Sequence, residues 1–235
     1  MVGWGAPEAR DVPGSQVWKR RFGVRVIVTR PVGQADALAE GLRRLGHEVV
    51  LCPLVRIEPL GDDPVDVTSY DWVIVTSANG ADELARRMQG RPRRLAAVGP
   101  ATAVALAAHG YEADLVPRVA TQEGVLDELP PPAGRVLVAA AESARRLLVD
   151  ELSADFVPLY RTVELRPAEP PQGDLAVLAS GSAARAFAAL ELAVPAVSIG
   201  PQTTEAAEAA GVHVVAEAET HDVEGILTAV ARLAS

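Results

Sequence analysis

Val98–Thr102 has the sequence VGPAT and Ile199–Thr203 has the sequence IGPQT, so a Gly-Pro turn followed by a threonine occurs twice in this chain. The similarity extends beyond the two turns, because further residues recur at the same separation along the chain. The pairs are Gly99 and Gly200, Thr102 and Thr203, Gly110 and Gly211, Glu123 and Glu224, Gly124 and Gly225, and Leu126 and Leu227. A constant offset through this many identities indicates a repeated supersecondary unit.

The repeat has two parts, which alternate along the chain. The first part contains an apolar strand at Arg25–Arg30 (RVIVTR), a helix over residues 34–45 and a strand in HEVVLCPL, and it returns from Arg135 to Arg161. The second part starts at Asp71 with the strand DWVIVTS and continues as helix, strand (RLAAVG), helix, strand (EADLVP) and a final helix near Thr121. Its counterpart starts at Asp174 and ends with a helix near His221. Short apolar strands alternating with helices predict an α/β fold with parallel sheets.

Two Pro-rich stretches, Pro53–Pro64 and Pro158–Pro171, separate the parts of the repeat. Each is too long and too rich in proline for a turn within one sheet. We therefore expect them to link two bodies.

Composition excludes several classes of protein. The 235 residues are 49% hydrophobic and 23% charged, as in soluble globular proteins, and a net charge of −9 argues against a nucleic-acid partner. No segment reaches the ~20 apolar residues that span a bilayer, and the N-terminus lacks a secretory signal, so we expect a cytoplasmic protein without membrane contact. Residues 1–22 are rich in Gly and Pro and are expected to form a disordered tail. Cys52 is the single cysteine and is expected to be a small buried hydrophobe.

Small polar residues gather where predicted strands end. In parallel α/β sheets this is the edge at which ligands bind, because the N–H groups of the following helices point outward there. The same residue types are also ordinary helix caps, so each position has two interpretations. As an anion site, the candidates are Arg30, Thr76, Ser77, Asn79, Gly99, Thr102, Ser180, Ser182, Gly200 and Thr203.

Motifs of other site classes are absent from the sequence. It contains no G-x-G-x-x-G, no Walker A motif, no H-E-x-x-H, no C-x-x-C and no G-x-S-x-G. The histidines, His47, His109, His213 and His221, never stand four residues apart, so no metal site is expected.

Five stretches together resemble a known family, the uroporphyrinogen-III synthases. They are VIVTRP at Val26, YDWVIVTSANG at Tyr70, VGPATAVAL at Val98, VPLYRT at Val157 and SIGPQTTEAA at Ser198. The resemblance covers about Val24 to Val230, nearly everything except the N-terminal tail.

The resemblance implies two flavodoxin-like three-layer α/β domains joined by a two-stranded β connector, with the two Gly-Pro turns facing one cleft. Domain I would then be discontinuous, with residues 23–55 and 170–235, and domain II would span residues 66–158. Residues 53–65 and 159–170 would be the connectors.

The implied reaction converts hydroxymethylbilane, a linear tetrapyrrole with eight carboxylates, into uroporphyrinogen III with loss of water and inversion of the last ring. No cofactor is implied. Tyr160 matches the tyrosine that assists departure of the hydroxyl, although an aromatic packed at a strand end is the alternative. Arg161 and Arg30 would pair with substrate carboxylates, although the alternative for an exposed arginine at a strand end is that it is only solvated. The family also implies a monomer, with transient contact to hydroxymethylbilane synthase.

Two departures from the family pattern concern individual sites. Ala139–Ala141 stands where the family often has a Pro-Arg pair, and Ala179–Ser182 (ASGS) replaces a T-S-P-S sequence. Two further functions stay open at this point: a non-catalytic tetrapyrrole or anion sensor on the same fold, and a two-lobed binder of phosphorylated small molecules.

Overall fold

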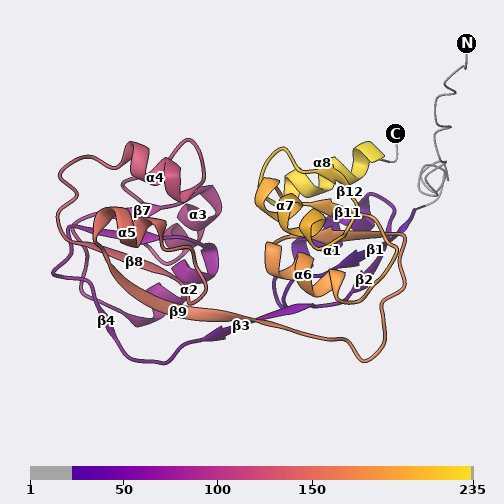
Figure 1. Ribbon diagram of the computed structural model, residues 1–235, viewed down its shortest axis with the longest axis horizontal. Coiled ribbons are helices and arrows are strands. Elements are labelled where there is room, and N and C mark those ends of the chain that lie inside the picture. Colours follow the sequence, from indigo (N-terminus) through magenta and orange to yellow (C-terminus); the bar gives the residue numbers. More distant parts are fainter. Residues whose placement is uncertain (1–22, 234–235) are drawn as a thin grey trace, which may run out of the picture. The chain divides into compact units, whose positions relative to one another are not determined.

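The computed structural model describes residues 23–233, and these form two compact units (Figure 1). Unit 1 combines the described residues up to Val55 with those from Glu164 onward, and unit 2 is the segment Arg56–Val163. The chain therefore passes from one unit to the other within each Pro-rich stretch. The predicted tail, residues 1–22, lies outside the described residues.

Unit 1 is built on a five-stranded sheet in which every neighbouring pair is parallel. Its spatial order is β12-β11-β10-β1-β2. The strands are β1 (Arg25–Val28), β2 (Glu48–Leu51), β10 (Leu175–Leu178), β11 (Ala196–Ser198) and β12 (Val214–Glu217). The central strands are buried apolar runs, as expected where helices cover both faces of a parallel sheet.

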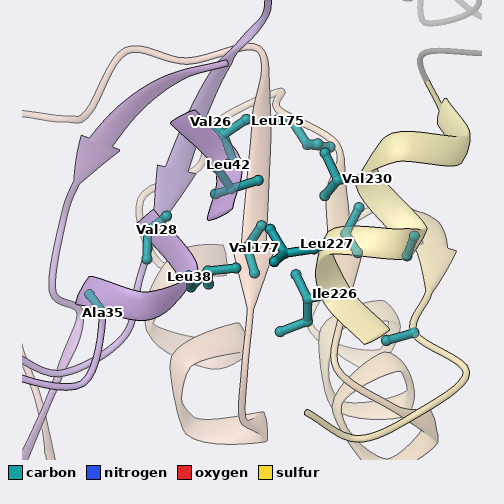
Figure 2. Packing of buried hydrophobic residues seen from close by; sticks show 13 residues of the cluster. Val26, Val28, Ala35, Leu38, Leu42, Leu175, Val177, Ile226, Leu227 and Val230 are labelled. Carbon is teal, nitrogen blue, oxygen red and sulfur yellow. The ribbon is translucent and has the colours of Figure 1, made fainter. Parts of the chain in front are cut away.

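Helices cover both faces of this sheet. On one face, Val26, Leu175 and Val177 of the strands pack against Leu42 of α1 (Asp36–Arg44) and Val230 of α8 (Val223–Leu233), as Figure 2 shows. On the other face, α6 (Gly181–Ala188) and α7 (Pro201–Ala209) close a second cluster. Each fully buried Leu or Val side chain contributes about 1.5–3 kcal/mol to folding. The two clusters therefore fix the strand ends that carry the polar residues.

Unit 2 has a five-stranded sheet in the order β3-β9-β8-β5-β7. Its strands are β3 (Val55–Pro59), β5 (Trp72–Val75), β7 (Leu95–Ala97), β8 (Val136–Ala141) and β9 (Asp155–Glu164). All neighbours from β9 to β7 are parallel. Beside β9, the pairing is antiparallel, because Leu60 N donates to Leu159 O at 2.8 Å and Leu165 N donates to Leu54 O at 2.8 Å. A short parallel ladder joins β4 (Val65–Asp66) to β6 (Met88–Gln89).

The helices of unit 2 also lie on both faces of its sheet. One face packs against α2 (Ala78–Arg87) and α3 (Pro100–Ala108), with Leu84 and Leu106 fully buried. The other packs against α4 (Gln122–Glu128) and α5 (Leu147–Leu152), with Val125 and Leu148 fully buried. The predicted α/β class with parallel sheets is confirmed.

The repeat identified in the sequence corresponds to the same spatial order in both units. Unit 1 runs β2-β1-β10-β11-β12 across its sheet, and unit 2 runs β9-β8-β5-β7 and then a single parallel bridge from Ala96 to Leu115. In both, the two strands of the first part lie beside the strands of the second part. The chain order differs, because the first part precedes the second in unit 1 and follows it in unit 2.

The recurring glycines have the same structural role in both units. Gly110 and Gly211 follow the ends of α3 and α7 with φ of +81° and +87°, the left-handed region that glycine adopts without steric cost. A Cβ on Gly124 would lie 2.1 Å from Val119 O, and one on Gly225 would lie 2.0 Å from Thr220 O. The glycines therefore recur in both copies because two of these positions have a backbone conformation that favours glycine and the other two leave no space for a Cβ.

One predicted strand was wrong. Residues 112–117 (EADLVP) contribute only the bridge from Leu115 to Ala96. The Asp114 carboxylate accepts from Leu95 N at 2.8 Å, and Pro117 has no N–H to donate, so the segment cannot continue a ladder along β7. The prediction for Cys52 is confirmed, since its side chain is buried and this burial raises the pKa of the thiol. Within residues 23–233, no helix has the length and apolarity to traverse a bilayer.

Candidate functional site

The end of β5 places three of the predicted residues at the carboxyl edge of the unit 2 sheet. Thr76 follows the strand directly, and its N–H donates to Ala139 O of β8 at 3.3 Å. Ser77 is the N-cap of α2, and its Oγ accepts from Gly80 N at 3.0 Å. Asn79 lies in the first turn of the same helix. The sequence thus interrupts an apolar strand with a capping serine, and the helix begins there.

Tyr160 reaches this edge from β9, two strands away from β5. Its backbone pairs with Ala141 at the end of β8, and its phenol crosses to Ser77, with Tyr160 Oη and Ser77 Oγ 2.9 Å apart. The side chain is 6% exposed. Ala139, Ala140 and Ala141 carry only methyl groups on the intervening strand. The three alanines supply no polar side chain to this edge, and Ala139 and Ala140 are fully buried.

The environment of the Tyr160 phenol has opposing effects on its pKa. Burial raises the pKa above its ordinary value, because a buried phenolate loses its hydration. Hydrogen bonds to the Ser77 and Asn79 side chains act in the opposite direction, and burial prevails. The phenol is therefore protonated at neutral pH and can donate a proton.

Gly99 and Thr102 lie at the neighbouring strand of the same edge. Gly99 is the N-cap of α3, with Pro100 at the first helical position, and Thr102 N donates to Gly99 O at 3.1 Å. Thr102 is buried. Pro100 has no N–H and the N–H of Thr102 is bonded to Gly99, so Ala101 carries the N–H group that this helix start leaves without an intrahelical partner.

Arg161 follows Tyr160 but contacts a carboxylate of the protein itself. Its Nε donates to Glu58 Oε2 at 2.8 Å, and its Nη2 lies 2.7 Å from the same oxygen. The hydrogen bond from Arg161 holds the pKa of the Glu58 carboxyl below its usual range. The Arg161 guanidinium is thus engaged with Glu58 in this structure.

In unit 1, the carboxyl edge carries a similar set of residues on adjacent strands. Ser180 follows β10 as the N-cap of α6 and accepts from Ala183 N at 3.2 Å, and its Oγ lies 3.2 Å from Ser182 Oγ. Gly200 follows β11 as the N-cap of α7, and Thr203 N donates to Gly200 O at 3.0 Å. Both threonines of the Gly-Pro turns, Thr102 and Thr203, are 5% exposed.

Arg30 follows β1 at this edge and differs from Arg161 in its contacts. Its guanidinium forms no ion pair or hydrogen bond with any residue between 23 and 233. Partial burial lowers its pKa, yet an arginine still stays charged at neutral pH. A half-buried cation without a protein partner among the described residues is suited to an anionic ligand.

His221 lies at the unit 1 edge, although reasoning from the sequence did not place it there. A Cβ on Gly200 would lie 2.7 Å from its Cδ2, so the imidazole rests against the turn before α7. At the equivalent place in unit 2, a Cβ on Gly99 would lie 3.0 Å from Ala120 Cβ. The constant offset between the repeats aligns His221 with Ala120. This alignment could have placed His221 at the unit 1 edge from the sequence alone.

A family model described as uroporphyrinogen-III synthase HemD matches residues 36–228, which is most of the chain. The chain belongs to the uroporphyrinogen-III synthase family. The match includes all of the site residues described above except Arg30.

Individual members of the uroporphyrinogen-III synthase family agree with this assignment. The uroporphyrinogen-III synthase of Synechococcus elongatus is 26% identical over 253 residues, covering 89% of this chain and 95% of that protein. A relative from Methanocaldococcus jannaschii is 28% identical over 151 residues, and the match spans 60% of this chain and 63% of the relative. The crystal structure of a mutant uroporphyrinogen III synthase from Thermus thermophilus aligns with a TM-score of 0.60 and 17% identity over 90% of this chain and 98% of the other, which supports a shared fold.

Proposed function

We propose that this chain is a uroporphyrinogen-III synthase, an enzyme of porphyrin biosynthesis that converts hydroxymethylbilane into uroporphyrinogen III with inversion of the last ring and loss of water. The family match over residues 36–228 carries the proposal. We propose further that the two units are flavodoxin-like domains, since the unit 1 strands, numbered in chain order, follow the sheet order 2-1-3-4-5. β3 and β9 would be their connector.

Tyr160 acts as the general acid in this proposal. Its phenol protonates the terminal hydroxyl of the bilane, which leaves as water and produces an electrophilic azafulvenium cation beside the phenolate. The substituted position of the last ring attacks this carbon to give a spiro intermediate, which fragments and recloses. The final loss of a ring proton returns a proton to the phenolate, so the enzyme ends in its starting state. General acid catalysis of this kind contributes about 10²–10⁴ in rate.

The substrate carboxylates require donors, and the carboxyl edges of both sheets offer them. Backbone N–H groups at the starts of α2, α3, α6 and α7 are positioned for anions, because unpaired N–H groups and the helix dipole both favour negative charge. Arg30 adds a full positive charge to the unit 1 edge. Charge-assisted hydrogen bonds contribute about 1.5–3 kcal/mol each, so a few of them hold an octacarboxylate despite the net charge of −9.

We also propose, as the resemblance implies, a monomeric, cytoplasmic enzyme that receives the bilane by transient contact with hydroxymethylbilane synthase.

An isomer assay tests the proposed activity directly. Hydroxymethylbilane closes unaided to the type I isomer, so the protein is added to bilane generated in place and the oxidised porphyrins are separated by chromatography. We expect the type III isomer to replace type I in proportion to added protein. An unchanged type I yield would instead indicate a non-catalytic sensor on the same fold.

A further inference from the structure

The Ser77 hydroxyl joins two parts of unit 2 that are far apart in the sequence. It lies 2.9 Å from Tyr160 Oη, across 83 residues of chain, and either oxygen could supply the hydrogen. It also accepts the N–H of Gly80 at 3.0 Å. One hydroxyl therefore contacts both the start of α2 and the tyrosine.

The Gly80 contact limits what the hydroxyl can do for Tyr160. A serine hydroxyl has one hydrogen and two lone pairs, and Gly80 N–H occupies one lone pair. The hydrogen is left for another acceptor, and Tyr160 Oη is within reach. Gly80 itself favours this arrangement, since a Cβ there would lie 3.1 Å from Ser77 Oγ.

The direction of the hydrogen bond decides whether the phenol can act as an acid. If Tyr160 donated to Ser77, its only hydrogen would point at the protein. If Ser77 donates, the phenol hydrogen is free to reach a ligand. The Gly80 contact favours the second arrangement, because Ser77 Oγ already accepts that N–H and keeps its own hydrogen for Tyr160 Oη.

We propose that Ser77 is a positioning residue for the catalytic tyrosine: its hydroxyl donates to Tyr160 Oη and so directs the phenol hydrogen toward the hydroxyl that leaves the substrate. The inference rests on the proposed function, in which Tyr160 is the general acid. It gives Ser77 a role inside the protein in place of direct contact with a substrate carboxylate. Asn79 is the second side chain at the same phenol.

A double-mutant cycle on turnover tests this role. Ser77→Gly removes the hydroxyl while glycine remains an acceptable N-cap, and it is made in the parent and in the Tyr160→Phe variant. We expect Ser77→Gly to lower kcat for type III formation about threefold to tenfold in the parent, with KM within twofold. Added to Tyr160→Phe, it should have no further effect, because the acceptor oxygen is already gone.

A purely structural role for Ser77 gives a different pattern. Loss of the helix cap alone would lower kcat by the same factor in both backgrounds, and that result would overturn the proposal. Full kcat in the Ser77→Gly variant would overturn it as well. Ser77→Thr retains a hydroxyl and is expected to keep kcat within twofold of the parent.

A matched control separates capping from positioning. Thr121 caps α4 in the same unit, and its Oγ1 accepts from Gly124 N at 3.1 Å. Thr121→Gly therefore removes a comparable cap without touching the phenol, and we expect its kcat to equal that of the parent. Far-UV circular dichroism checks that each variant is folded, and Ser77→Ala replaces Ser77→Gly in the cycle if the glycine variant is not.

A spectroscopic titration tests the hydrogen bond independently of activity. The chain has three tyrosines, so the ionisation of Tyr160 is obtained as the difference between variants that differ only at residue 160. We expect Ser77→Gly to raise the pKa of Tyr160, because the phenolate loses a donor, and an unchanged pKa would overturn the proposal. If the parent protein forms no type III isomer, the proposed function fails, while this titration still decides whether Ser77 donates to Tyr160.

Discussion

The two capping serines, Ser77 and Ser180, occupy equivalent places in the two units but have different neighbours. Each follows the strand that opens the second part of the repeat, and each accepts an N–H three residues along the chain. Ser77 also contacts the Tyr160 phenol, whereas the side-chain contact of Ser180 is with the Ser182 hydroxyl. The alignment of the repeats pairs Tyr160 with Val55, which has no polar side-chain atom. Duplication thus produced two similar edges, and the tyrosine stands at one of them.

The largest expected effect comes from removing that tyrosine's hydroxyl. Tyr160→Phe should lower the rate of type III formation about a hundredfold or more, with little change in KM. In the parent, the protonated phenol is the active form and burial raises its pKa, so activity should persist through neutral pH and be lost only as the pH rises through a value above the ordinary 10. Rates measured across pH test both statements.

Tyr111→Phe is the matched control for this substitution. Tyr111 lies in the same unit, where its ring stacks against Arg91. We expect its variant to keep the parental rate. A Tyr160→Phe variant with the parental rate would mean that the two edges do not differ in chemistry.

The next effect distinguishes the two arginines, one at each edge. Arg30 has no ion-pair partner among residues 23–233, whereas Arg161 is paired with Glu58. Arg30→Gln should raise KM about tenfold or more, as expected for loss of a charge-assisted hydrogen bond. Arg161→Gln should raise it less than about threefold, since its charge already has a protein partner. Steady-state kinetics of the two variants decide, and the reverse ranking would contradict the assignment.

The smallest effect is on stability. Ser180→Ala should destabilise the start of α6 by about 1 kcal/mol, the usual value for a lost N-cap. Ser77→Ala should cost about 0.5–1.5 kcal/mol more, because the bond to a buried phenol is lost as well. Hydrogen exchange of peptides from β5 and β10 measures the two units separately. Equal losses of stability in Ser77→Ala and Ser180→Ala would mean that the hydrogen bond to Tyr160 adds no stability.

The order and type of the elements followed from sequence, because the signals are local. Apolar runs such as WVIV at Trp72 bounded by capping residues predict strands and helix starts, and the recurring glycines predict the turns. The segment from Glu112 to Pro117 failed because a side chain, Asp114, takes a backbone donor from the strand beside it. An apolar pattern in the sequence does not reveal that a side chain will accept a backbone N–H in place of a strand carbonyl.

The site was only partly predictable from sequence. The residues at each strand end could be named, since they precede helices, and Tyr160 was identified by resemblance. Its contact with Ser77 could not be predicted, because it depends on the register that pairs Ala141 with Tyr160. The pairing of Arg161 with Glu58 likewise depends on β3 lying beside β9.

The alternating arrangement of the repeat has a consequence for synthesis on the ribosome. Unit 2 is one uninterrupted segment, whereas β1 of unit 1 takes its inner neighbour from the far half of the chain, with Val26 opposite Leu175. At roughly 5–20 residues per second, the nascent β1 waits about 7–30 s for that neighbour to emerge. Unit 2 therefore folds first. Unit 1, which contains the first strand to be synthesised, is the last to be completed.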